Sequence, residues 1–136
     1  MRFLPTVLVS IVIACSSAAP ADCVAGSFRA GAAAVDITPR KLGVSITGGF
    51  QDRQAIAVAD KLHARGVVID DGTTRVAIVV CDICLISREI FDAAETEASR
   101  ATGIPVDRMM MSATHTHTAP TAVPLAQCNP TPEYVA

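Results

Sequence analysis

Runs of hydrophobic residues, separated by turn residues, divide the middle of the chain into elements whose type can be predicted. Residues 66–81 hold two β-branched runs joined by Asp71-Gly72, which is the turn chemistry of a β-hairpin. The second run, residues 76–80, is continuously apolar and predicts a strand covered on both faces. An earlier apolar run within residues 28–37 predicts a first strand.

A helix is predicted over residues 87–102, after the hairpin. Ser87 can cap its amino end, and Gly103 with the proline that follows is the usual stop signal. One apolar stripe along this helix is formed by Phe91, Ala94, Ala98 and Ala101. Residues 106–113 predict another strand, so the segment 75–113 is expected to form a right-handed β-α-β unit with parallel strands. The predicted fold class is therefore α/β, a β-hairpin plus a β-α-β unit.

The segment between the first strand and the hairpin has no clear periodicity. Residues 42–50 predict a loop in which Gly48 and Gly49 let the backbone approach a ligand closely, or form a plain turn. Residues 54–61 predict a loop or a short helix.

The first residues have the pattern of an export signal. Residues 1–21 start with one arginine, continue with an apolar run shorter than the roughly 20 residues of a membrane span, and end in Ala-Pro-Ala. Residues 12–15, Val-Ile-Ala-Cys, instead resemble a bacterial lipobox, which would make Cys15 a lipidated first residue. The protein is therefore expected to be exported, as a periplasmic, secreted or lipid-anchored protein with a domain over residues 22–136.

Composition narrows the function classes. The formal net charge of −2 offers no basic patch for nucleic acid, so no nucleic-acid partner is expected. Four cysteines follow Cys15, namely Cys23, Cys81, Cys84 and Cys128, and in an exported protein they permit disulfides in three connectivities that the sequence cannot rank. Cys81 and Cys84 also have the Cys-x-x-Cys spacing of a redox pair, although packing at a strand end or a bridge to a neighbour is favoured.

Two histidines follow the last predicted strand. The apolar run 109–113 leads into Thr-His-Thr-His-Thr, and in extended backbone His115 and His117 would point to the same side. Two imidazoles at the carboxyl end of a strand form half of a site for zinc or a related metal, with threonine hydroxyls fixing the tautomers. The alternative is a solvated polar loop.

Two further polar residues are predicted near this edge of the sheet. Asp82 ends the neighbouring strand and is a candidate metal ligand, hydrogen-bond partner of a histidine, or strand-end cap, with the cap favoured. His63 leads into the hairpin and is interpreted as structural or as part of the rim of the site.

The order of several short motifs resembles one known family. The motifs are Ala34-Val-Asp-Ile-Thr-Pro39, Thr47-Gly-Gly-Phe50, Leu62-His-Ala-Arg65 and Ser112-Ala-Thr-His-Thr-His-Thr-Ala-Pro120. They are similar to the amino-terminal part of the neutral/alkaline (non-lysosomal) ceramidase family over roughly residues 28–125 of this chain. The Thr-His-Thr-His segment is the most specific of them.

The resemblance implies a zinc-dependent amidohydrolase that cleaves the N-acyl bond of ceramide into sphingosine and a fatty acid. It implies that His115 is a Zn²⁺ ligand and that His117 lies beside the substrate and takes part in catalysis. The substrate partner would be a lipid amide, met at a membrane surface. Thr118-Ala119-Pro120 departs from the Ser-Gly-Pro common in the family, and the loss of the glycine narrows that loop.

The family completes its zinc site with residues farther along the chain than Ala136. The expectation is therefore an amino-terminal fragment of a larger mixed-sheet metallohydrolase domain that alone binds zinc weakly and is inactive. The alternative function is a non-catalytic exported lipoprotein or binding module with the same fold.

Overall fold

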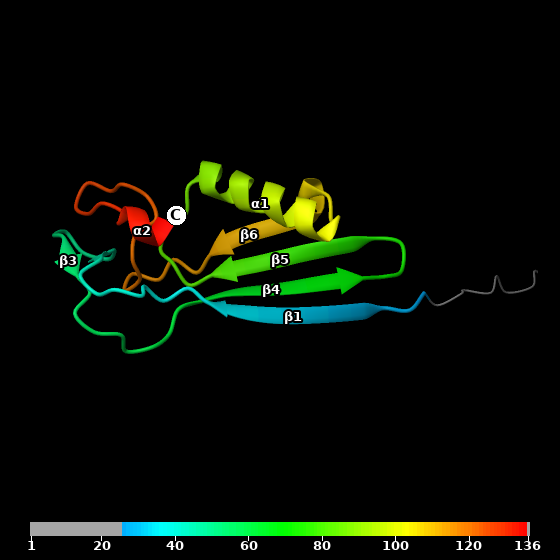
Figure 1. Cartoon of the computed structure of the whole chain (residues 1–136), viewed down its shortest axis with the longest axis horizontal. Coiled ribbons are helices and arrows are strands. Elements are labelled where there is room, and N and C mark those ends of the chain that lie inside the picture. Colours follow the sequence, from blue (N-terminus) through cyan, green and yellow to red (C-terminus); the bar gives the residue numbers. More distant parts are fainter. Residues whose placement is uncertain (1–25, 136) are drawn as a thin grey trace, which may run out of the picture.

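The computed structural model describes residues 26–135 (Figure 1). The predicted signal, with Cys15, and the first later cysteine, Cys23, lie outside the described residues. Among residues 26–135, no helix has both the length and the apolar character needed to cross a membrane.

A four-stranded mixed sheet forms the centre of the fold, in the order β1-β4-β5-β6. Its strands are β1 (Arg29–Asp36), β4 (His63–Asp70), β5 (Arg75–Cys81) and β6 (Met109–Ala113). β1 and β5 both pair with β4 in antiparallel fashion, and β5 pairs with β6 in parallel. The α/β class, the hairpin and the β-α-β unit predicted from the sequence are confirmed.

The β4–β5 turn lies at Asp71-Gly72, as predicted, and the Asp71 side chain holds it. The Asp71 carboxylate accepts hydrogen bonds from the backbone N–H groups of Thr73 (2.9 Å) and Thr74 (2.7 Å), while Gly72 has φ 92°. The hydrogen bond from Thr73 N–H is the main reason that the pKa of Asp71 lies below its ordinary value.

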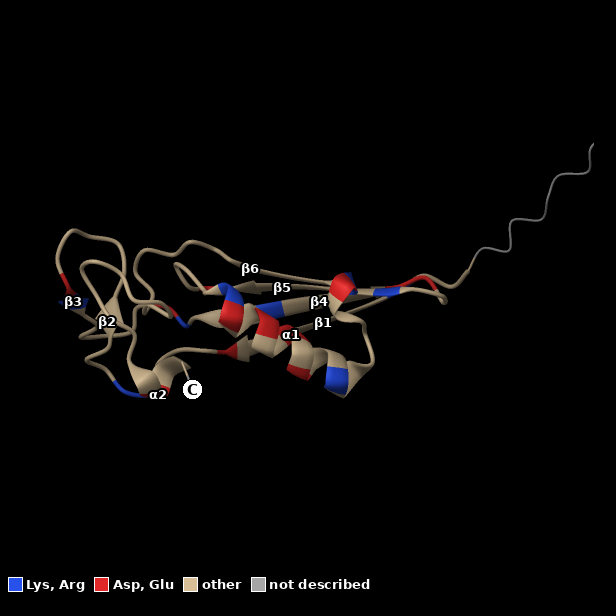
Figure 2. Cartoon of the chain, turned by 90° about the horizontal axis from the view of Figure 1, so that it is seen from above, with Lys and Arg blue, Asp and Glu red and all other residues tan. Residues whose placement is uncertain are grey.

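Helix α1 (Arg88–Thr102) begins and ends where its capping residues predict. Ser87 accepts a hydrogen bond from the N–H of Ile90, and Gly103 closes the helix in the left-handed region, with φ 71°. The predicted stripe is partly wrong, because Ala94 and Ala101 are exposed and Glu95 is buried. Glu95 and Ala98, four and seven residues after Phe91, lie on the same face of the helix as Phe91. Ala94 and Ala101, three and ten residues after Phe91, lie at the edge of that face. Acidic and basic residues are interspersed along the helix (Figure 2).

Two other expectations about strands need correction. Residues Val106–Arg108 form a 3₁₀ turn, η1, in which the N–H of Arg108 donates to the Pro105 carbonyl (3.0 Å), so β6 begins only at Met109. β5 is half-buried after Arg75 rather than covered on both faces. The described helix that packs on the sheet is α1, which contacts β6.

The loops gather at the end of the sheet where β5 and β6 finish (Figure 1). They include a small antiparallel sheet of β2 (Ser45–Ile46) and β3 (Arg53–Gln54), in segments predicted as a loop and as a loop or short helix, and the short helix α2 (Pro132–Val135). A hydrophobic cluster of Ile83, Ala119 and Ala122 lies at this end. The most buried part of the described chain is therefore the loop region, and the candidate chemistry lies within it.

Candidate metal centre

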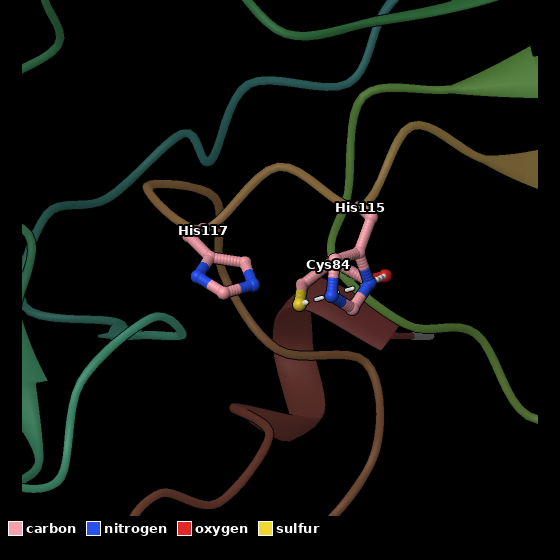
Figure 3. A group of neighbouring side chains, drawn as sticks. All are labelled: Cys84, His115 and His117. Atoms are coloured by element: carbon pink, nitrogen blue, oxygen red, sulfur yellow. Dashed lines mark hydrogen bonds between the residues drawn. The ribbon is translucent and has the colours of Figure 1, made fainter.

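Three side chains meet beyond the carboxyl ends of β5 and β6, and they come from two different loops (Figure 3). Cys84 lies in the β5–α1 loop, and His115 and His117 lie in the loop after β6. The ring centroids of the two histidines are 4.8 Å apart, and one ligand atom from each of the three residues lies within 4.8 Å of the others. The predicted approach of His115 to His117 is present in the structure.

The backbone reason given for that approach is wrong. β6 ends at Ala113, and His115 has φ 60°, so the segment is not extended. A histidine in the left-handed region is uncommon and costs some backbone energy. The two rings converge because the chain turns at this residue, with an interplanar angle of 62°.

The tautomer of His115 is set by a backbone carbonyl. Its Nδ1 lies 3.1 Å from the carbonyl oxygen of Cys84 and 3.8 Å from the Cys84 Sγ. Because a carbonyl oxygen only accepts hydrogen bonds, Nδ1 carries the hydrogen and Nε2 of the neutral ring keeps its lone pair. Threonine hydroxyls were expected in this role, but Thr114 and Thr116 hydrogen-bond each other at 2.6 Å. The Nε2 atom of His115 is thus ready to bind a metal ion.

Backbone hydrogen bonds tie the histidine loop to the loop that carries Cys84. The N–H of Thr114 donates to the Cys81 carbonyl (2.9 Å), and the N–H of Thr116 donates to the Ile83 carbonyl (3.3 Å). These bonds continue the parallel pairing of β5 and β6 beyond the strands. They explain why Cys84 lies next to His115.

Gly48 contacts His117, at a position where a ligand was predicted to approach. A Cβ atom on Gly48 would lie 2.2 Å from the His117 carbonyl oxygen and 2.4 Å from its Cβ, and Gly48 has φ 97°. Gly49 has a negative or extended φ, is exposed, and would place a Cβ no closer than 3.5 Å to Arg53. Gly48 therefore sets the position of His117, whereas a Cβ on Gly49 would meet Arg53 and Gln51 instead.

Asp82 is held in an ion pair away from the histidines. Its Oδ2 accepts a hydrogen bond from Arg65 Nη1 (2.5 Å) and one from the backbone N–H of His63 (3.0 Å). Burial acts to raise the pKa of Asp82, but these two hydrogen bonds outweigh it, and the pKa lies below its ordinary value. The carboxylate caps the strand end, and the His63 ring lies 3.2 Å from Arg65 at the rim.

A cavity of about 610 Å³ adjoins the histidine loop. Its polar lining includes Thr116, Thr118 and Asp82, and its apolar lining includes Leu42, Ile46, Ile56, Val58 and Leu62. A second cavity, of about 660 Å³, is lined by Cys81 and Ile83. Neither histidine lines either cavity, but the first one includes Thr116 and Thr118, the two residues that flank His117 in the sequence.

Sequence reasoning did not include Cys84 in the site. The thiol is 4% exposed, and Cys81, Cys84 and Cys128 are all free in the structure. The signal was available, because Cys84 follows the end of β5 as His115 follows the end of β6, at the same edge of the sheet.

Two solved structures resemble the fold of this chain. Neutral ceramidase from Pseudomonas aeruginosa superposes with a TM-score of 0.62 and 23% sequence identity, covering 69% of this chain and 16% of that chain. A ceramidase complexed with C2 matches equally well, with a TM-score of 0.62, 23% identity, and coverage of 69% of this chain and 15% of that one. The chain has a ceramidase-like fold. It spans only about one sixth of the length of these ceramidase chains.

The resemblance expected from the Thr-His-Thr-His segment is thus confirmed at the level of the ceramidase-like fold. No protein-family model matches the chain. No curated protein matches it either.

Gly48→Ala is predicted to destabilise the chain, because the added Cβ meets His117 and the left-handed backbone disfavours a side chain. We expect a loss of about 1–3 kcal/mol in the free energy of unfolding, measured by chemical denaturation. The matched control Gly49→Ala should stay within about 0.5 kcal/mol of the unchanged chain. Equal effects at the two glycines would contradict the assigned contact.

Asp82→Asn is predicted to lower the thermal unfolding temperature at neutral pH and to have little effect in acid. Because the folded-state pKa of Asp82 is depressed, its contribution is present above the unfolded pKa of about 3.9 and is lost as the pH falls through the folded value. Unfolding temperatures at several pH values test this, with Asp107→Asn on the exposed η1 turn as control. A difference that is independent of pH would rule out the charge of Asp82 as its cause.

Proposed function

We propose that this chain is part of a zinc-dependent amidohydrolase that cleaves the N-acyl bond of a ceramide-type lipid amide. The observation that carries the proposal is the position of His115, just beyond the carboxyl end of β6 with its Nδ1 on the Cys84 carbonyl, within a ceramidase-like fold. Imidazole nitrogen is a preferred ligand of Zn²⁺, so the donor present fits this ion. When bound, zinc lowers the pKa of a coordinated water to about 7 and polarises a carbonyl group.

His117 supplies the proton chemistry in this proposal. Its ring is exposed and lies beside His115, while Gly48 packs against its backbone and fixes its position. An imidazole can take a proton from an attacking water and give one to the amine that leaves. His117 is therefore the candidate catalytic residue, and His115 the candidate metal ligand.

The cavity beside the histidine loop supports a lipid substrate. Its apolar lining from residues 42–62 suits an acyl chain, and its polar lining includes Thr116 and Thr118, which flank His117 in the sequence. One of the similar ceramidases is complexed with C2. Phe50 and Ile56 are almost fully exposed on neighbouring loops, which favours contact with a membrane surface. An exported location stays a prediction from residues 1–21, and the expected lack of nucleic-acid binding stays a prediction from charge.

Because the chain spans 16% of the Pseudomonas ceramidase chain, hydrolysis is proposed for the native protein that carries this segment. That protein, captured with an antibody against residues 26–135, should release fatty acid from an N-acylsphingosine. A chelator should abolish the release, and added Zn²⁺ should restore it.

His115→Ala in the native protein should lower kcat/KM at least about 100-fold, because the metal ligand is lost. The matched control is His63→Ala, whose ring contacts Arg65 and not the metal group, and it should keep most of the activity. Activity that survives chelation or His115→Ala would overturn the proposal. Lipid binding without hydrolysis, indifferent to chelators, would instead support the non-catalytic binding module.

A further inference from the structure

The second cavity, of about 660 Å³, has no part in the proposed reaction. Three segments line it, namely residues 36–44, residues 81–90 from the end of β5 to the start of α1, and residues 131–135, which include α2. Figure 1 shows α2 near the amino end of α1, at the loop end of the sheet. The volume is within the range of about 300–1,000 Å³ that is usual for small-molecule sites. This cavity is therefore a candidate for a separate binding site.

Much of the lining of this cavity is apolar. Ile86 and Ile90 are half-buried there, and with Tyr134 they pack against the cluster that contains Ile83 and Ala122. Burial is the main reason that the pKa of Tyr134 is raised to about 12, so the phenol stays neutral at physiological pH and adds no negative charge. An alkyl chain suits such a lining, because its binding removes apolar surface of both molecules from water.

The charged residues of the lining leave an excess of positive charge. Arg40 and Lys41 are exposed, and neither forms an ion pair among residues 26–135. The charge of Asp36 is already compensated, because Lys61 Nζ lies 3.0 Å from its Oδ2. Glu133 is the other carboxylate of the lining, so two cations without a partner are balanced by one free carboxylate. A carboxylate group on a ligand would supply the missing partner through charge-assisted hydrogen bonds.

We propose that this second cavity binds a single-chain fatty acid, with the alkyl chain against the apolar lining and the carboxylate at Arg40 and Lys41. Apolar walls with a few charged groups that fix the orientation of the ligand are the usual composition of such a site. A cationic amphiphile fits less well, because the guanidinium and ammonium groups repel its head group. Binding in this cavity requires neither the two histidines nor amide hydrolysis, so the inference stands apart from the proposed function.

The unchanged 136-residue chain carries its own probe of this cavity. It has one tyrosine and no tryptophan, so its intrinsic tyrosine fluorescence comes from Tyr134, which lines the cavity. Titration with decanoate, kept below its micelle concentration, should change this fluorescence until binding saturates. Acetate should cause no change, because it lacks the apolar part. Decyltrimethylammonium should bind at least about tenfold more weakly, because its head group has the opposite charge.

The double variant Arg40→Gln/Lys41→Gln tests the position of the carboxylate. It should bind decanoate about tenfold more weakly or worse, since charge-assisted hydrogen bonds are lost, and should bind the uncharged decan-1-ol as the unchanged chain does. The matched control Arg29→Gln/Arg108→Gln removes the same charge at residues outside this cavity and should bind decanoate normally. All four residues are exposed, so both variants should fold like the unchanged chain.

Cys81 provides a second measurement without any substitution, because it lines the cavity and its thiol is free. Decanoate should slow the alkylation of Cys81 by iodoacetamide, read by peptide mass mapping. The same protection is expected in the native protein captured with the antibody. Cys128 is also free but does not line the cavity, so the rate of its alkylation should stay unaltered.

Tyrosine fluorescence that ignores decanoate, or an Arg40→Gln/Lys41→Gln variant that binds it as tightly as the unchanged chain, would overturn the inference. So would equal weakening in the Arg29→Gln/Arg108→Gln control. Protection of Cys81 in the 136-residue chain but not in the native protein would overturn it too, since another part of that protein then fills the cavity. Failure of the proposed function looks different, because decanoate would bind while the native protein released no fatty acid. Hydrolysis without decanoate binding would keep the function and remove this site.

Discussion

The backbone pairing that holds the histidine loop is the constraint on which the candidate site depends. A buried loop must satisfy its own N–H and carbonyl groups, since no helix or strand does so for it. Here the buried Thr47 donates both its N–H (3.0 Å) and its hydroxyl (3.1 Å) to the Ala119 carbonyl, and the N–H of Thr121 donates to Ser45. Two loops far apart in sequence are thereby hydrogen-bonded into one packed layer, and the close approach of Gly48 to His117 is its consequence.

This layer also explains where the chain is most buried. The strands of the main sheet are exposed or half-buried, whereas Thr47, Ala119 and Thr121 are almost fully buried. Packing therefore stabilises the loop end more than the sheet, and the sheet acts mainly to bring β5 and β6 side by side. Packing of this kind limits the positions that each side chain of the loops can take, so the geometry of a site built from these loops is better defined.

The parts of the fold that were predicted from the sequence depend on local chemistry. Asp71-Gly72 defines its own turn, and Ser87 and Gly103 define their own helix ends, so neighbouring residues suffice. The candidate site was predicted only in part, because its other members meet through tertiary packing. No local signal places Gly48 against His117, or indicates that His115 takes a positive φ. The position of Cys84 needed the register of β5 on β6 before it could be inferred.

Cys84 contributes two separate groups to the candidate site, its backbone carbonyl and its thiol. Its carbonyl accepts a hydrogen bond from His115 Nδ1, and its thiol lies close to the ring nitrogens of His115 and His117. A carbonyl, unlike a carboxylate, orients the imidazole without adding negative charge to the site. Because every residue type has a backbone carbonyl, replacing the side chain changes the donor set while the orienting hydrogen bond to His115 remains. The two roles of this residue are therefore separable: the carbonyl orients His115 whatever the side chain is, and the thiol lies beside the two histidines as a third candidate donor.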